Sequence, residues 1–325
     1  MFRVKFYIIF LGIILCFLII KSNWFSFDQT LPTSLGDPLE LIIINTTKFE
    51  GNFYNKLEEL LTVNLGPSPQ VENILKISRV PSDKFQGVLR RHQNLLFVER
   101  GKEFSLKTQK NIYAENQTII LLTISSYQEL LLNKEKIISL VDVIKRTEIN
   151  RLKKKFKKNI NVSLANKILK KYNFSLSPPK GFYLAHEDSN LIWFRRETPK
   201  IGQGVLITTL NDQEDFENFS EKKITQIIDS HVNVILGPVE NSFMVTESDA
   251  AIKTEPYVLN TQNSIKVQSL WRIENDFMGG IYVAYFFQNE VSKTPTLIFT
   301  YLYAPGERKN ISLLQLESLV HTISY

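Results

Sequence analysis

Four charged residues in the C-terminal part of the chain have side chains that could line a polar ligand pocket. Arg272, Glu274 and Asp276 lie within the segment Trp271–Gly280, and Arg308 lies in a later turn. Guanidinium and carboxylate groups brought together in this way can bind a polar ligand or take part in its chemistry. As structure alone, the two segments are a hairpin and a strand-to-helix connection, and both interpretations stay open at this point.

The alternation of residues along a strand predicts how the first segment is arranged. Arg272 and Glu274 fall on one face, where they can pair, and Trp271 and Ile273 fall on the other. Gly279-Gly280 permits a positive φ or a close approach of the backbone. The charged face is therefore the one on which a ligand site would lie.

Apart from these residues, the sequence has no pattern of a known catalytic or cofactor site. It has no glycine-rich phosphate loop, no dinucleotide-binding fingerprint and no nucleophile elbow. The chain has one cysteine and four scattered histidines, so a zinc site would need ligands from distant segments. The acid pairs Glu187-Asp188 and Glu214-Asp215 are typical of turns and of first helical turns. We expect no metal, no cofactor and no catalytic residues. The histidines that we interpret as structural are His92, His186, His231 and His321.

The first 21 residues determine where the rest of the chain works. Arg3 and Lys5 precede an apolar run, Phe6–Ile20, and Lys21 follows it. Positive charge before an apolar run keeps the N-terminus in the cytoplasm and favours passage of the following chain across the membrane. As a helix the run spans about 22 Å, and the flanking lysines can reach the interface and lengthen the usable span. We expect residues 1–21 to form a membrane anchor and the rest to face the periplasm or cell envelope.

Cys16, the single cysteine, leaves three outcomes open for this segment. A lipidated cysteine would make the protein a bacterial lipoprotein, but Leu15 stands where that signal requires a small residue. An ordinary cleaved signal also requires small residues before the cut, and none has a persuasive spacing between Leu15 and Ser26. The sequence therefore favours an uncleaved anchor over lipidation at Cys16 and over cleavage.

The positive charge of the chain is concentrated in one segment. The formal net charge is +6, and residues 145–171 contain eleven Lys and Arg against Glu148 alone. Leu152, Phe156 and Ile160 recur every four residues there and predict an amphipathic helix with a solvated basic face. Nucleic acid is not an expected partner, because an exported protein meets little of it. The alternative to a solvated face is contact with anionic lipid headgroups through Lys153, Lys154, Lys155, Lys157 and Lys158.

Runs of strands interleaved with a few helices predict an α+β fold, with mainly antiparallel sheets packed against helices. The expected domains are a membrane anchor (residues 1–21), a linker (22–38), an N-terminal α+β part ending in basic helices (39–172) and a strand-rich C-terminal part (173–325). Helices are predicted at about 51–63, 126–158, 212–230 and 307–324. Strands are predicted at 39–44, 74–80, 94–99, 118–125, 174–178, 181–185, 191–196, 204–210, 243–246, 264–274, 281–287 and 295–303.

Several short motifs, in order along the chain, carry a resemblance to a known family. They are Leu31–Gly36, Arg91–Asn94, Arg146–Arg151, Gly237–Met244, Trp271–Gly280 and Tyr303–Arg308. As an ordered set they resemble domain-of-unknown-function family 4837, from about Leu31 to the C-terminus. The resemblance implies a membrane-tethered envelope protein of a Gram-negative bacterium, in most members a predicted lipoprotein. It implies no catalytic residues.

The chain departs from the family at two positions. Asn241 stands where the family pattern has glycine, which could tilt that turn, and Cys16 lies in a poor context for lipidation. From the anchor and the lack of a catalytic pattern we infer a non-enzymatic envelope protein that binds another envelope component or has a structural role. The alternative is a small-ligand receptor or an enzyme whose site is formed by the four charged residues named above.

Overall fold

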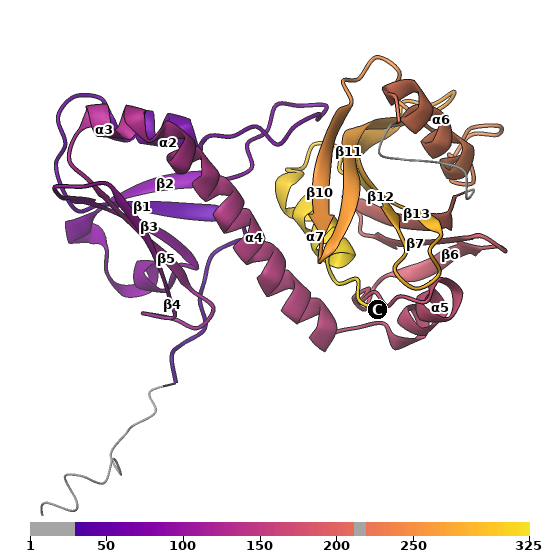
Figure 1. The fold of residues 1–325 in the computed structure, drawn as a ribbon, viewed down its shortest axis with the longest axis horizontal. Coiled ribbons are helices and arrows are strands. Elements are labelled where there is room, and N and C mark those ends of the chain that lie inside the picture. The colour runs from indigo at the N-terminus through magenta and orange to yellow at the C-terminus, as the bar shows by residue number, and fades with distance from the viewer. Residues whose placement is uncertain (1–29, 211–218) are drawn as a thin grey trace, which may run out of the picture.

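The N-terminal half is built on a five-stranded sheet with the strand order β2-β1-β3-β5-β4 (Figure 1). The computed structural model describes residues 30–210 and 219–325, so the predicted anchor and Cys16 lie outside the described residues. The strands are β1 (Glu40–Asn45), β2 (Lys76–Pro81), β3 (Asn94–Arg100), β4 (Ser105–Lys110) and β5 (Thr118–Ile124). The helices of this half are α2 (Phe53–Leu61), α3 (Tyr127–Leu132) and the long α4 (Lys134–Lys158).

Most of this sheet is parallel, which differs from the mainly antiparallel pairing that is expected and that the fold has as a whole. β1 pairs in parallel with β2 and β3, and β3 pairs in parallel with β5, while β4 is antiparallel to β5. The central strands are buried on both faces: Ile43 and Leu96 belong to the core under the helices, whereas Ile42 and Leu95 pack with Phe85 on the other side. Strands buried on both faces are typical of parallel sheets and have continuous apolar runs in the sequence.

The C-terminal half is built on an eight-stranded antiparallel sheet, as predicted, and the two halves together confirm the α+β class. The strand order is β10-β11-β12-β13-β8-β7-β6, and β9 pairs with β11. The strands are β6 (Tyr183–Glu187), β7 (Leu191–Glu197), β8 (Gly202–Thr209), β9 (Met244–Thr246), β10 (Lys253–Leu259), β11 (Gln262–Ile273), β12 (Gly279–Gln288) and β13 (Pro295–Tyr303). The helices are α5 (Val162–Tyr172), α6 (Glu221–Val232) and α7 (Asn310–Val320).

Helices cover both faces of the C-terminal sheet. Leu316 of α7 and Ile168 of α5 share a core cluster with Val283 of β12. Ile228 of α6 belongs to the cluster on the opposite face, together with Phe299. α7 is buried on nearly all sides, because it lies between this sheet and α4 (Figure 1).

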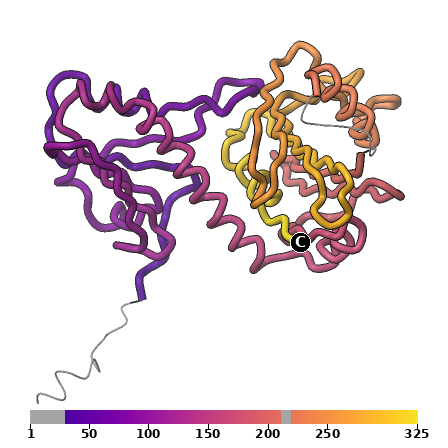
Figure 2. Tube along the Cα trace, viewed as in Figure 1, coloured from indigo at the N-terminus to yellow at the C-terminus, as the bar shows by residue number. Residues whose placement is uncertain are grey.

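Two segments join the halves (Figures 1 and 2). α4 runs from the N-terminal sheet to the C-terminal half, and the loop of residues 62–75 reaches across to β11 and α7. Gln268 Nε2 donates to the carbonyl oxygen of Leu65 at 3.1 Å, and Lys309 Nζ lies 3.0 Å from Glu72 Oε1. The largest core cluster contains side chains from both halves, so the halves share one buried core.

The helix predicted at 126–158 is two helices, α3 and α4, which meet at Asn133. Asn133 Nδ2 donates to the carbonyl oxygen of Glu129 at 3.0 Å and ends α3. The helix predicted at 212–230 falls partly outside the described residues, and its described part overlaps α6. In residues 30–210 and 219–325, no helix has both the length and the apolar character needed to cross a membrane.

Candidate functional site

A buried carboxylate, Glu317, lies between two lysines at the junction of the two halves. Its side chain on α7 is 2% exposed; Lys145 Nζ of α4 lies 2.7 Å from Oε2, and Lys266 Nζ of β11 lies 2.7 Å from Oε1. Burial alone would raise the pKa of Glu317, but the two ammonium groups outweigh this effect and hold the pKa well below its ordinary value. The charged carboxylate therefore links α4, α7 and β11.

Lys266 is held at its buried position by two acids and an aromatic ring. Its Nζ lies 3.6 Å from Glu255 Oε1 and 5.1 Å from the centroid of the Tyr257 ring. Burial opposes the charge, but Glu317 raises the pKa of Lys266 above its ordinary value. A buried ammonium without such partners would be strongly unfavourable, so the surrounding groups keep Lys266 next to Tyr257.

Tyr257 and His321 connect this cluster to a cavity. The Tyr257 hydroxyl lies 2.5 Å from Nε2 of His321. Burial raises the pKa of Tyr257 to about 12, helped by the charge of Glu317. Burial also lowers the pKa of His321 to about 4, and nearby lysines add to this effect. Both side chains are neutral at pH 7, and with the hydroxyl donating to Nε2 the ring proton lies on Nδ1. Within the described part of the chain, Nδ1 has no hydrogen-bond partner.

The cavity next to this pair lies between α4, β10 and the end of α7, and we call it the inter-half groove. It has a volume of about 500 Å³. Its lining contains two cations and no acid. The lining residues are Arg146, Ile149, Asn150, Lys153, Pro256, Tyr257, Val258, Asn260 and His321.

The chemistry of the inter-half groove suits an anion. Arg146 and Lys153 have no ion-pair partner among the residues that the structure describes. Burial, together with the neighbouring charge of Lys157, lowers the pKa of Lys153. The guanidinium, the ammonium, the Asn150 amide and the N–H at Nδ1 of His321 can all donate hydrogen bonds. A carboxylate or phosphate group in the groove would meet donors and positive charge on several sides.

The four charged residues predicted to line a ligand pocket are brought together in part. Arg272 Nη1 lies 2.6 Å from Glu274 Oε2, in the pairing that strand alternation predicted. On the other face of the strand, Trp271 and Ile273 are buried, also as predicted. The charges of Arg272 and Glu274 therefore neutralise each other.

The other two predicted residues have separate environments. The Asp276 carboxylate accepts hydrogen bonds from the backbone N–H groups of Phe277 at 2.5 Å and Met278 at 3.3 Å, which closes the hairpin turn. Arg308 is exposed, and in residues 30–210 and 219–325 no hydrogen bond or ion pair joins it to Arg272, Glu274 or Asp276. None of the four predicted residues lines the inter-half groove.

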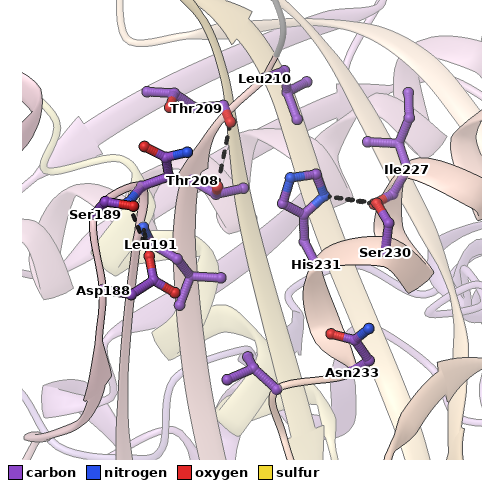
Figure 3. Close-up of a pocket in the computed structure, with 12 residues that line it drawn as sticks. Asp188, Ser189, Leu191, Thr208, Thr209, Leu210, Ile227, Ser230, His231 and Asn233 are labelled. Atoms are coloured by element: carbon purple, nitrogen blue, oxygen red, sulfur yellow. Dashed lines mark hydrogen bonds between the residues drawn. The ribbon is translucent and has the colours of Figure 1, made fainter.

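A second cavity, of about 420 Å³, lies between β7, β8 and α6 (Figure 3). Ser230 and His231 face it, but they do not form a serine–histidine dyad. His231 Nδ1 lies 2.8 Å from the carbonyl oxygen of Ile227 and 3.1 Å from Ser230 Oγ, so this nitrogen donates to the backbone and cannot act as a base toward the serine. Asp188 accepts a hydrogen bond from the N–H of Asn190 at 2.8 Å. The His231 Nδ1 atom and the Asp188 carboxylate are thus both hydrogen-bonded to nearby backbone groups.

A second buried polar cluster joins strands of the N-terminal sheet to α4. Arg151 Nη1 lies 2.5 Å from Glu148 Oε1, Arg151 Nη2 donates to Thr118 Oγ1 at 2.7 Å, and Asn94 Nδ2 donates to Glu148 Oε1 at 2.6 Å. Burial raises the pKa of Glu148 and outweighs the opposite effect of Arg151. Asn94 and Thr118 begin their strands, whereas ligand sites of parallel sheets lie at the carboxyl ends. We therefore interpret this cluster as structural.

The inter-half groove was not predicted, although its supporting residues leave a signal in the sequence. Glu317 is the single acid of a mostly apolar helix, and Lys266 lies between Ile265 and Val267 in a buried strand. Charged residues at core positions need partners, and such partners gather at functional or structural polar sites. Among the described residues, no group of three or more His, Cys, Asp or Glu side chains could hold a metal ion.

Comparison with protein families divides the chain in two. Residues 161–322 match the family model described as Domain of unknown function (DUF4837), and residues 34–157 match a second, Domain of unknown function (DUF8532). A search of curated proteins found no match. The inter-half groove takes Arg146 and Lys153 from the second match and Tyr257 and His321 from the first.

Proposed function

Because the chain belongs to the DUF4837 family, whose description assigns no activity, we propose a function that is based on the inter-half groove. The protein binds a small anionic ligand in this groove. The observation that carries this proposal is the convergence of Arg146 and Lys153 on a cavity without an acidic residue. With the Tyr257 hydroxyl donating to Nε2, the N–H at Nδ1 of His321 adds a neutral donor. The recognised group is a carboxylate or a phosphate, because both accept several charge-assisted hydrogen bonds at once.

The second part of the proposal concerns location. Residues 1–21 tether the protein to a membrane, and the rest of the chain faces the periplasm, so the ligand is a component of the cell envelope. The support is the sequence pattern of Arg3 and Lys5 before the apolar run Phe6–Ile20.

The third part is that the protein binds its ligand without changing it. His321 is neutral, and its Nε2 is occupied by the Tyr257 hydroxyl. The Glu317 carboxylate is enclosed by Lys145 and Lys266. These contacts support positioning roles for both residues rather than proton transfer to a ligand.

Isothermal titration of the full chain in detergent tests this function, with inorganic phosphate, glycerol 3-phosphate and acetate as probes and glycerol as the uncharged control. We expect at least one anion to bind and glycerol not to bind. Arg146→Gln and Lys153→Gln should each weaken the binding about tenfold or more, since loss of one charge-assisted contact costs about 1.4 kcal/mol or more.

Lys134→Gln is the matched control, because Lys134 is an exposed lysine at the other end of the same helix. It should leave the affinity unchanged. Anion affinities that stay the same in both groove variants would contradict the proposed function, and so would the absence of binding by every anion.

A further inference from the structure

The lysines at the C-terminal end of α4 form an exposed cationic surface, which we call the lysine ridge: Lys154, Lys155, Lys157 and Lys158. Leu152 and Phe156 on the same helix are buried, which fixes the rotation of α4 and turns the ridge away from the core. Within the described residues, none of the four lysines has an ion-pair partner. Lys153 is separate from the ridge, because it lines the inter-half groove.

The ridge carries more charge than the helix itself requires. Cations in the last turn of a helix are stabilised by the helix dipole, which accounts for one or two of them. Lys154 lies three residues before Lys157 and four before Lys158, and like charges at these spacings repel. No acid is paired to any of them in the described part of the chain, so an external negative charge would reduce this repulsion.

The position of the ridge relates it to the proposed membrane anchor. In the view of Figure 1 the C-terminal end of α4 and the indigo start of the described chain both lie toward the lower edge of the molecule. Eight residues, 22–29, separate Thr30 from the proposed anchor, and eight residues span at most about 28 Å. A tether of this length would keep the start of the described chain close to the membrane surface, and the lysine ridge lies toward the same edge in the view of Figure 1.

We propose that the lysine ridge docks on the anionic phospholipid surface of the membrane that holds the anchor. This inference rests on the proposed tether for the orientation of the protein, and it is independent of ligand binding in the inter-half groove. Each lysine near an anionic surface strengthens membrane association by about fivefold. The contact would hold α4, and with it one wall of the groove, at a fixed position relative to the bilayer.

The test is the reaction of lysine amines with an acetylating reagent in the full chain, measured residue by residue by mass spectrometry. The protein is added to vesicles of phosphatidylcholine alone and to vesicles that also contain phosphatidylglycerol. We expect acetylation of the four ridge lysines to fall about threefold or more on the anionic vesicles and to recover at high salt. Exposed Lys293, in the turn between β12 and β13, should react equally on both.

Flotation with neutral vesicles distinguishes a failure of the ridge inference from a failure of the proposed membrane tether. A protein that floats with neutral vesicles and whose ridge lysines react equally on both kinds of vesicle has its tether, and the ridge inference is overturned. A protein that fails to float with neutral vesicles but shows ridge protection on anionic vesicles supports the ridge and contradicts the tether. Replacement of the four ridge lysines by glutamine should abolish any salt-sensitive binding to anionic vesicles, and unchanged binding would also overturn the inference.

Discussion

Lys145 of α4 and Glu317 of α7 form a 2.7 Å ion pair that crosses from one half of the chain to the other. Glu317 also binds Lys266 of the C-terminal sheet, so one carboxylate holds together three elements that are distant in the sequence. Two of these elements, α4 and α7, border the inter-half groove together with β10. The ion cluster therefore fixes the geometry in which Arg146 and Lys153 face a common cavity.

Glu317→Gln should destabilise the protein by about 3 kcal/mol or more, because it leaves two buried ammonium groups without their shared counter-charge. Equilibrium unfolding in urea at pH 7 measures this loss.

The triple variant Lys145→Met, Glu317→Leu and Lys266→Met is the control, since it removes Glu317 together with both of its lysines, and Glu255 keeps its pairing with Lys253. It should be clearly more stable than Glu317→Gln, because an apolar replacement of a whole buried ion cluster costs little. A Glu317→Gln protein as stable as the wild type would show that the cluster has no such role.

Arg151→Ala should lower the free energy of unfolding by about 3 to 5 kcal/mol, because it leaves the buried Glu148 without its cation. Arg146→Ala, five residues earlier on the same helix, should change the stability by less than about 0.5 kcal/mol, because Arg146 is exposed. Urea unfolding of the two variants side by side distinguishes the structural arginine from the groove arginine, and equal losses would contradict the assignment.

His321 should make the protein less stable as the pH falls. Its pKa is lowered from 6.5 to about 4 by folding, so between these values the unfolded chain binds a proton that the folded chain does not. The contribution is intact above pH 6.5 and is lost progressively as the pH falls toward 4. Between pH 7 and pH 5 the loss from this group is about 2 kcal/mol.

His321→Gln keeps an acceptor for the Tyr257 hydroxyl and removes the titration. The difference in unfolding free energy between pH 7 and pH 5 should shrink by about 2 kcal/mol in this variant. His186→Gln, at a histidine whose side chain is 40% exposed, should keep the wild-type difference. The same pH dependence in all three proteins would be inconsistent with a buried neutral His321.

Asn241→Gly should leave the stability within about 0.5 kcal/mol of the wild type, whereas Asn241→Ala should lower it by about 1 kcal/mol. Asn241 has a φ of 57°, in the left-handed region that glycine and asparagine adopt most easily. The asparagine therefore has the backbone conformation that the family's glycine would favour. Thermal unfolding of both variants tests this, and an Ala variant as stable as the Gly variant would contradict it.

Much of the strand and helix pattern could be predicted, and the misses have physical reasons. β4 and β10 were not predicted, because both are edge strands with many polar residues, and β10 also contains Pro256. Edge strands bury little and therefore have a weak apolar signal. The segment 174–178 was predicted as a strand, but it makes a single bridge, between Ser175 and Ser324.

The candidate site was harder to predict than the fold. The Arg272–Glu274 pair follows from alternation within one strand, and the sequence is sufficient for it. The groove unites Lys153, Tyr257 and His321, which come from three elements, and only the tertiary packing of α4 beside β10 and α7 brings them together. No local spacing carries that information, so the signals in the sequence are two charged residues in apolar segments, Glu317 and Lys266.

Native mass spectrometry of the full chain, purified gently from its own membranes, is the most direct test of anion binding in the inter-half groove. The wild-type protein should carry a small anionic molecule, and the Arg146→Gln, Lys153→Gln double variant should lack it while Lys134→Gln retains it. A wild-type protein without any bound anion, or an anion retained equally by the double variant, would contradict the proposed function.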